Sequence, residues 1–165
     1  MAVVRVYVPV GRDELQSLAS SSSLAASSDS PLTAYAVTSA LRERAPGLDV
    51  EDLEFAAFSD AVAAAGARRS SPGHRRVVVA ADADPAWVEP AVAGAHGGAG
   101  APSAVSIVTA VPLGRVASFH VDEESAQPGE GAPSAGSDPA DAEEEAAGLL
   151  WYDVTELDDV CGFLG

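Results

Sequence analysis

The segment from Arg75 to Asp84 places the tightest constraint on the fold of this chain. It reads RRVVVAADAD, and the run from Val77 to Ala81 contains no polar residue. A strand with one face in water alternates apolar and polar residues, whereas an unbroken run of β-branched and small residues is typical of a strand buried on both faces. We therefore expect a central strand against which helices pack.

Other apolar segments bounded by turn residues also predict strands. They lie at residues 3–10, 33–38, 104–111, 116–121 and 149–154. Strands and helices interleave early in the chain, and strands cluster late. This order predicts one α+β domain, with a mixed sheet of about five or six strands and two or three helices mostly on one face. It is compatible with a ferredoxin-like arrangement.

The clearest predicted helix follows Asp49, a favoured N-cap residue, and has acidic residues in its first turn. Its apolar residues form one broad stripe that we expect to be buried: Val50, Leu53, Phe55, Ala57, Phe58, Ala61 and Val62.

Shorter helices are expected to begin at Asp13, at Thr38 or Ser39, and at Thr155, where Asp158 would complete a capping box. The serine-rich residues 20–30 and the glycine-rich residues 96–102 predict loops, and residues 85–92 predict a single turn carrying Trp87.

Negative charge is concentrated toward the C-terminal side. Residues 1–120 hold 12 acidic and 9 basic side chains, whereas residues 121–165 hold 13 acidic and none basic. Residues 123–148 mix Pro, Gly, Ser, Ala and acids with too little apolar surface to offset the entropy of ordering. We therefore expect a disordered acidic insertion there, with residues 1–122 and 149–165 forming the domain. This charge would repel phosphates and disfavours direct nucleic-acid binding.

Composition excludes several classes of function. The chain has no lysine, so it has no P-loop lysine, Schiff-base lysine or lysine general base. The single Cys161 cannot form an internal disulfide, and no CxxC spacing suggests zinc. No apolar run approaches the roughly 20 residues of a membrane span, and the N-terminus lacks signal-peptide features. We expect a cytoplasmic protein without a cofactor.

Four side chains at predicted strand ends are the best candidates for metal ligands. Asp82 and Asp84 end the central strand, and His120 and Asp122 end another. If the two strands adjoin, these carboxylates and the imidazole could hold a divalent cation. The alternative is that the aspartates are solvated turn residues and that His120 faces water. The glycine run at residues 94–100 does not fit GxGxxG and favours a loop.

Trp151 and Tyr152 follow the acidic segment and allow two interpretations. In one, Trp151 packs inside with Leu149 while Tyr152 points outward. In the other, the two aromatic residues form a contact surface for a partner, because aromatic side chains dominate binding hot spots. The neighbouring negative charge would favour a basic protein partner.

Six blocks span nearly all of the expected folded part: RVYVPV, AYAVTSALRE, EDLEFAAFSDA, RRVVVAADAD, VPLGRVASFHVDE and LLWYDVTEL. Together they resemble a family of small actinobacterial proteins of unknown function. The absence of lysine and asparagine, whose codons are AT-rich, fits such an origin. The resemblance implies a shared fold and no particular chemistry. The C-terminal segment departs from the family pattern, because it is richer in proline and glycine and ends soon after LLWYDVTEL.

These observations favour a non-enzymatic protein-interaction module with a flexible acidic arm at residues 123–148. Two alternatives stay open. One is a small metal-dependent enzyme that uses the four candidate ligands. The other is a small-molecule binding domain with a pocket under Trp87 or Trp151.

Overall fold

The computed structural model describes residues 2–68, 75–91, 100–122 and 148–163. Seven strands form the main sheet, in the spatial order β5 (Val88–Pro90), β6 (Ala104–Ile107), β3 (Leu32–Ala36), β1 (Val4–Val10), β4 (Val77–Ala83), β8 (Val116–Val121) and β9 (Leu150–Asp153). Every neighbouring pair is antiparallel. A second sheet pairs β2 (Ser23–Leu24) with β7 (Val111–Pro112).

The predicted α+β class and single domain are confirmed, but the sheet differs in detail from the prediction. It has seven strands rather than five or six, and its pairings are all antiparallel rather than mixed. The additional strand β5 has three residues, which is too short to show a periodic pattern. Strands β3 and β4 flank β1 and both run antiparallel to it, so the path from β3 to β4 is a split β-α-β unit of the ferredoxin-like kind.

Strand β4 is buried on both faces, as the apolar run predicts. Val77, Val79 and Ala81 lie in one hydrophobic cluster, and Val78 and Ala80 lie in the other. Successive side chains of a strand point to opposite faces, so an uninterrupted apolar run supplies both clusters. The strand lies next to β1, the middle strand of the seven.

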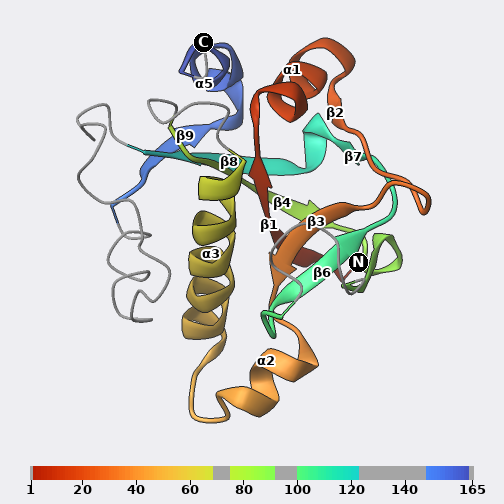
Figure 1. Ribbon diagram of the computed structural model, residues 1–165, viewed down its shortest axis with the longest axis vertical. Coiled ribbons are helices and arrows are strands. Elements are labelled where there is room, and N and C mark those ends of the chain that lie inside the picture. Colours follow the sequence, from red (N-terminus) through yellow and green to blue (C-terminus); the bar gives the residue numbers. More distant parts are fainter. Residues whose placement is uncertain (1, 69–74, 92–99, 123–147, 164–165) are drawn as a thin grey trace.

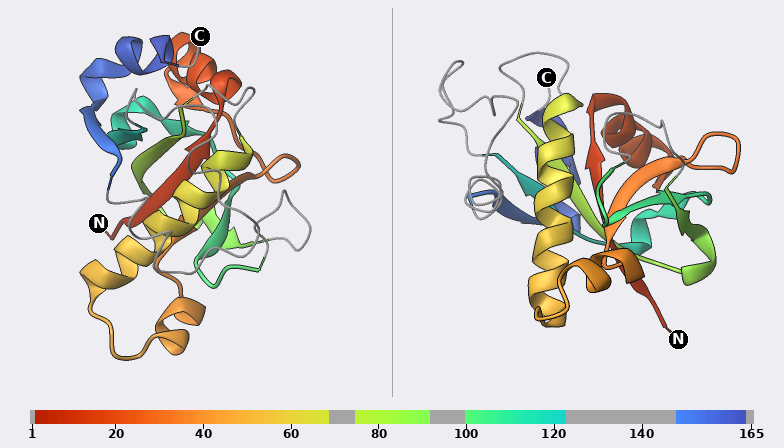
Figure 2. Two further views of the ribbon diagram at one scale, coloured as in Figure 1. Left: turned by 60° about the vertical axis from the view of Figure 1, so that its left-hand side comes forward. Right: turned by 60° about the horizontal axis from the view of Figure 1, so that its bottom comes forward.

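Helices cover both faces of the sheet (Figure 1). On one side, which we call the α3 face, lie α2 (Ser39–Arg44) and α3 (Val50–Ala67). On the other side, the α1 face, α1 (Arg12–Ser21) and α5 (Leu157–Gly162) pack next to each other (Figure 2). The prediction that helices lie mostly on one face is wrong, because periodicity identifies the apolar side of a helix but not the sheet face it covers.

Helix α3 begins as predicted, with the Asp49 side chain accepting a hydrogen bond from the Asp52 backbone N–H at 2.9 Å. The buried stripe is narrower than predicted. Leu53, Ala57, Phe58, Ala61 and Val62 are buried, whereas Val50 is 53% exposed and Phe55 is 38% exposed. Val50 is the first residue of the helix, and Phe55 lies at the flank of the stripe.

The other helix starts agree in part with the predictions. Thr38 caps α2 by accepting from the Leu41 backbone N–H. The N-cap of α1 is Gly11 rather than Asp13, and the Glu14 carboxylate accepts from the Gly11 backbone N–H at 3.0 Å.

At the C-terminal end of the chain, a short 3-10 helix (Val154–Glu156) precedes α5, and its N-cap is Asp153 rather than Thr155. A helix cap depends on where the preceding strand ends, which tertiary pairing decides.

Residues 20–30 hold more structure than their serine content predicts. Leu24 in β2 is 1% exposed and is paired with Val111 of β7. The predicted strand at 104–111 therefore divides into β6 and β7, which belong to different sheets. Residues 123–147 of the predicted acidic insertion, and residues 96–99 of the predicted glycine-rich loop, lie outside the described residues. No helix in the described ranges is long and apolar enough to cross a membrane.

Candidate functional site

The antiparallel pairing of β4 with β8 separates the four predicted metal ligands. The end of β8 lies beside the start of β4, so His120 is opposite Val78, and the Asp122 backbone N–H donates to the carbonyl of Arg76. Asp82 lies four residues farther along β4 than Val78, which is about 13 Å at 3.3 Å per residue. Only strands that end at the same edge would have brought the carboxylates and the imidazole together.

Each of the three aspartates has a different structural role. Asp122 forms an ion pair with Arg76 at 2.8 Å, in which the two side chains are 13% and 12% exposed. Asp82 accepts from Arg5 Nε at 2.7 Å, and Asp84 caps the short 3-10 helix that follows β4. Among the described residues, no three His, Cys, Asp or Glu side chains form a group that could hold a metal ion.

His120 is half-buried on the α3 face rather than facing water. Its ring lies 4.7 Å from the Phe58 ring, centroid to centroid, and its Nε2 lies 3.1 Å from the Ser118 hydroxyl. Burial lowers the pKa of His120 below its usual value, and the nearby Arg5 charge lowers that pKa further. Burial therefore favours the neutral form of the imidazole, and the buried Ser118 hydroxyl lies within hydrogen-bond distance of its Nε2.

Trp151 and Tyr152 lie the opposite way round from the predicted core arrangement. Trp151 is directly opposite His120, and residues opposite each other in an antiparallel pair project from the same face. Trp151 therefore lies on the α3 face, where it is 61% exposed. Tyr152 packs on the α1 face, with its ring 5.4 Å from that of Phe163. The interpretation with Trp151 in the core is wrong.

Four rings follow one another across the α3 face. Phe55 lies 6.3 Å from Phe58, Phe58 lies 4.7 Å from His120, and His120 is the cross-strand neighbour of Trp151. We call these four residues the aromatic row. Its ends, Phe55 and Trp151, are exposed, while Phe58 in the middle is buried. The row combines an anchored centre with two accessible aromatic ends.

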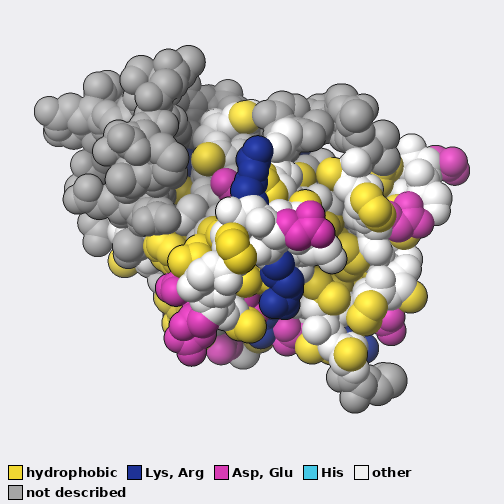
Figure 3. Space-filling view, turned by 90° about the horizontal axis from the view of Figure 1, so that it is seen from below, with side chains coloured by type: hydrophobic (Ala, Val, Ile, Leu, Met, Phe, Trp, Pro, Cys, Tyr) yellow, Lys and Arg dark blue, Asp and Glu magenta, His cyan; other side chains and the backbone are white. Residues whose placement is uncertain are grey.

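Acidic side chains border the helical end of the aromatic row. Glu51 and Asp52 are exposed one turn before Phe55 on α3. Residues three and four apart on a helix are surface neighbours, so these carboxylates flank the Phe55 ring. Burial and then the charge of Glu54 raise the pKa of Tyr7 to about 12. Figure 3 views the end formed by α2 and the first turns of α3, and it shows acidic side chains beside hydrophobic ones.

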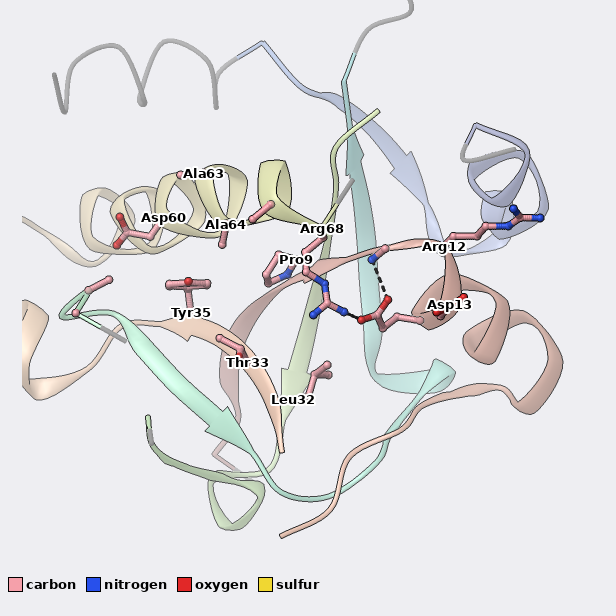
Figure 4. A pocket seen from close by; sticks show the side chains of 15 residues that line it. Pro9, Arg12, Asp13, Leu32, Thr33, Tyr35, Asp60, Ala63, Ala64 and Arg68 are labelled. Carbon is pink, nitrogen blue, oxygen red and sulfur yellow. Dashed lines mark hydrogen bonds and ion pairs between the residues drawn. The ribbon is translucent and has the colours of Figure 1, made fainter. Parts of the chain in front are cut away.

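A cavity of about 1130 Å³ lies between the second half of α3 and the part of the sheet formed by β1 and β3 (Figure 4). Helix α3 contributes Asp60 and three alanines, its C-cap residue Arg68 also lines the cavity, and β3 contributes Thr33 and Tyr35. Sequence reasoning did not find this cavity, and neither Trp87 nor Trp151 lines it. The sequence signal for it is the small-residue run at 63–67, from which Ala63, Ala64 and Ala67 line the cavity.

A family model described as "Family of unknown function (DUF6912)" matches residues 4–161. The chain belongs to this family. The match includes all strands of both sheets, and it confirms the resemblance to a family of unknown function. No curated protein and no solved structure was found to match the chain. Because the family description states no activity, function must be argued from the geometry of the residues.

Proposed function

We propose that the protein is an interaction module that binds a basic segment of a partner protein through the aromatic row. The observation that carries the proposal is Trp151, which is 61% exposed on the α3 face. Large exposed aromatic side chains are uncommon on free surfaces and are enriched at the centres of protein interfaces. This proposal keeps Trp151 as a partner contact and leaves out Tyr152, which packs on the α1 face.

The construction of the row suits it to binding. Phe58 is 8% exposed and is held between Tyr7, at 5.5 Å, and His120, at 4.7 Å, measured between ring centroids. A ring fixed in this way loses little side-chain entropy when a partner covers the row. Phe55 and Trp151 then offer apolar area on either side of this fixed centre.

Charge selects the chemistry of the partner. The formal net charge of the chain is −16, and exposed carboxylates of α3 lie beside Phe55. A partner segment with arginines would place a guanidinium over the indole of Trp151, the ring that attracts cations most strongly, and would pair with the carboxylates. The acidic residues of 123–148 add long-range attraction in this proposal, which accelerates association at low salt.

A peptide-display selection against the purified protein tests the proposal, because a random library samples basic, acidic and apolar segments together. We expect selected peptides to be rich in Arg or Lys combined with apolar residues. Trp151→Ala should weaken their binding by about 30-fold, the change that corresponds to a hot-spot loss of about 2 kcal/mol. Phe55→Ala should weaken it by a smaller factor.

Leu150→Ala is the matched control, because Leu150 is the next residue on β9, is 37% exposed and projects from the opposite face. It should change affinity by less than about two-fold, within the range of neutral interface residues. Selected peptides without basic residues, or affinities unchanged by both Trp151→Ala and Phe55→Ala, would refute the proposal.

The contribution of the acidic segment has a separate test. Replacing Glu143, Glu144 and Glu145 by Gln should slow association of the selected peptides at low salt and have little effect at about 0.5 M salt, where screening is strong. Identical association rates at low salt would remove the segment from the proposal and leave the aromatic row in place.

A further inference from the structure

The Tyr35 hydroxyl is the first of two unusual groups in the cavity under α3. The Tyr35 side chain is 2% exposed and lines the cavity. Within the described ranges, no residue forms a hydrogen bond with its hydroxyl. Every fully enclosed side-chain N or O atom of the described residues has a hydrogen-bond partner, so the Tyr35 hydroxyl is not fully enclosed. The hydroxyl must therefore open into the cavity, and a buried tyrosine hydroxyl normally has a partner. This arrangement leaves a donor and acceptor available to a ligand.

The second unusual group is the Asp60 carboxylate. It accepts a hydrogen bond from the Ser103 hydroxyl at 2.5 Å and, in the described part of the chain, has no ion-pair partner. Burial raises the pKa of Asp60 above its usual value, and burial and then the Asp60 charge raise the pKa of Tyr35. One hydroxyl uses only part of the acceptor capacity of a carboxylate. Asp60 therefore has lone pairs free for a cationic donor.

The arginines that line the cavity do not neutralise Asp60. Arg68 forms an ion pair with Glu14. Figure 4 shows the Arg12 guanidinium extending away from Asp60 and Tyr35. Among the described residues, no basic side chain therefore pairs with the Asp60 carboxylate at this end of the cavity. A cation bound there would stabilise the carboxylate charge in place of the water that burial removes, whereas an anion would be repelled.

The remaining wall suits a small apolar body rather than a bare ion. Ala64 of α3 and Thr33 of β3 line the cavity, together with the exposed residues Ala63 and Ala67. Apolar walls with a few convergent polar groups are typical of small-molecule sites. A divalent metal ion would need several oxygen ligands, and one carboxylate with one phenol does not supply them.

We propose that this cavity binds a small organic cation, an alkylamine or alkylguanidine, whose charged end lies between the Asp60 carboxylate and the Tyr35 hydroxyl. The ammonium or guanidinium N–H groups donate to Asp60 and to the Tyr35 oxygen, and the alkyl part packs on the alanines of α3. This site is separate from the aromatic row and does not depend on the proposed partner interaction.

Calorimetric titration tests the site with defined probes at about 0.15 M salt, where diffuse attraction to the acidic protein is screened. The cationic probes are butylamine, phenethylamine and butylguanidine. The matched probes are the uncharged alcohols 1-butanol and 2-phenylethanol and the anion pentanoate. We expect saturable 1:1 binding of at least one cation at millimolar concentration or below, and at least ten-fold weaker binding of its uncharged counterpart.

Three isosteric variants locate the binding. Asp60→Asn should weaken binding of the cation by at least ten-fold, and Tyr35→Phe, which removes only the hydroxyl, should weaken it by about three-fold or more. Asp13→Asn is the control, because Asp13 lines the same cavity without contributing to the Asp60 end. It should change affinity by less than two-fold.

The proposal is overturned by equal binding of cations and alcohols, by equal binding to the wild type and the Asp60→Asn variant, or by no saturable binding of any cation up to 10 mM. Thermal unfolding of each variant without ligand separates a folding defect from a binding defect. The cation should also raise the unfolding temperature of the wild type but not that of Asp60→Asn.

Discussion

The two faces of the sheet have different chemistry. The α1 face is filled by aliphatic side chains such as Val6, Val8 and Ile107, with Phe119 among them, and is closed by α1 and α5. The α3 face is packed by alanines and a few rings, and it carries Asp60 and His120. On the α1 face, large aliphatic residues fill the space between helices and sheet and bring no polar group. On the α3 face, the alanines and rings leave a cavity and an edge with exposed aromatic side chains. Both proposed binding sites therefore lie on the α3 face.

The largest effect is expected from Phe119→Ala on the α1 face. Phe119 is 0% exposed and lies within the aliphatic cluster, so its removal should cost about 3–5 kcal/mol of unfolding free energy. Phe58→Ala should lie at the lower end of that range, because Phe58 is 8% exposed beside the partly open aromatic row. Urea denaturation measures both losses. A larger loss for Phe58→Ala would reverse the assignment of the two faces.

The next largest loss of unfolding free energy is expected when the more buried of two ion pairs is broken. Asp122→Ala should cost about 3 kcal/mol, because it removes a carboxylate that pairs with the Arg76 guanidinium and accepts from the Arg76 backbone N–H, at a position where only 12% of the Arg76 side chain is exposed. Asp82→Ala should cost less than about 1 kcal/mol, since Arg5 and Asp82 are 37% and 35% exposed. Urea denaturation of both variants checks the order. Equal losses of unfolding free energy in the two variants would show that burial does not decide how much each ion pair contributes to stability.

A smaller effect is expected in the pH dependence of stability. Burial lowers the pKa of His120 in the folded protein below its usual value of 6.5. Between the folded pKa and 6.5 the unfolded chain binds more protons, so stability should fall as pH drops below 6.5. His120→Phe should remove this part of the slope, as measured by denaturation at a series of pH values.

At lower pH, Asp60 makes a contribution of the opposite sign to the change of folding stability with pH. Its pKa is raised above 3.8 in the folded protein, so its contribution is lost as pH rises through the folded pKa. Asp60→Asn is therefore the control for the His120 measurement. An unchanged slope below pH 6.5 in His120→Phe would contradict the burial of this imidazole.

The smallest effect on stability is expected from Trp151→Ala. Because Trp151 is 61% exposed, we expect a change in unfolding free energy within about 0.5 kcal/mol. Tyr152→Ala should cost more, since Tyr152 packs against the aliphatic cluster and Phe163. Thermal or urea unfolding compares these neighbours. A loss above about 2 kcal/mol for Trp151→Ala would identify it as a core residue and remove the basis of the proposed interaction surface.

Local patterns determined most elements of the fold. The unbroken apolar run predicts β4 with burial on both faces, and Asp49 predicts the start of α3. Strand β8 lies at the predicted residues 116–121. Each of these features depends on residues close together in the chain, where periodicity and capping chemistry act. The α+β class follows from the order of such elements.

The candidate sites depended on contacts between distant parts of the chain. The direction of β8 relative to β4 separates Asp122 from Asp82, and the sheet face covered by α3 decides that Trp151 is exposed while Tyr152 is packed. The cavity joins Asp60 of α3 with Tyr35 of β3, which are distant in the chain. A sequence pattern specifies the apolar side of each element. Only tertiary packing decides which elements meet, because strand pairing and helix placement are set by the total burial of the assembled chain.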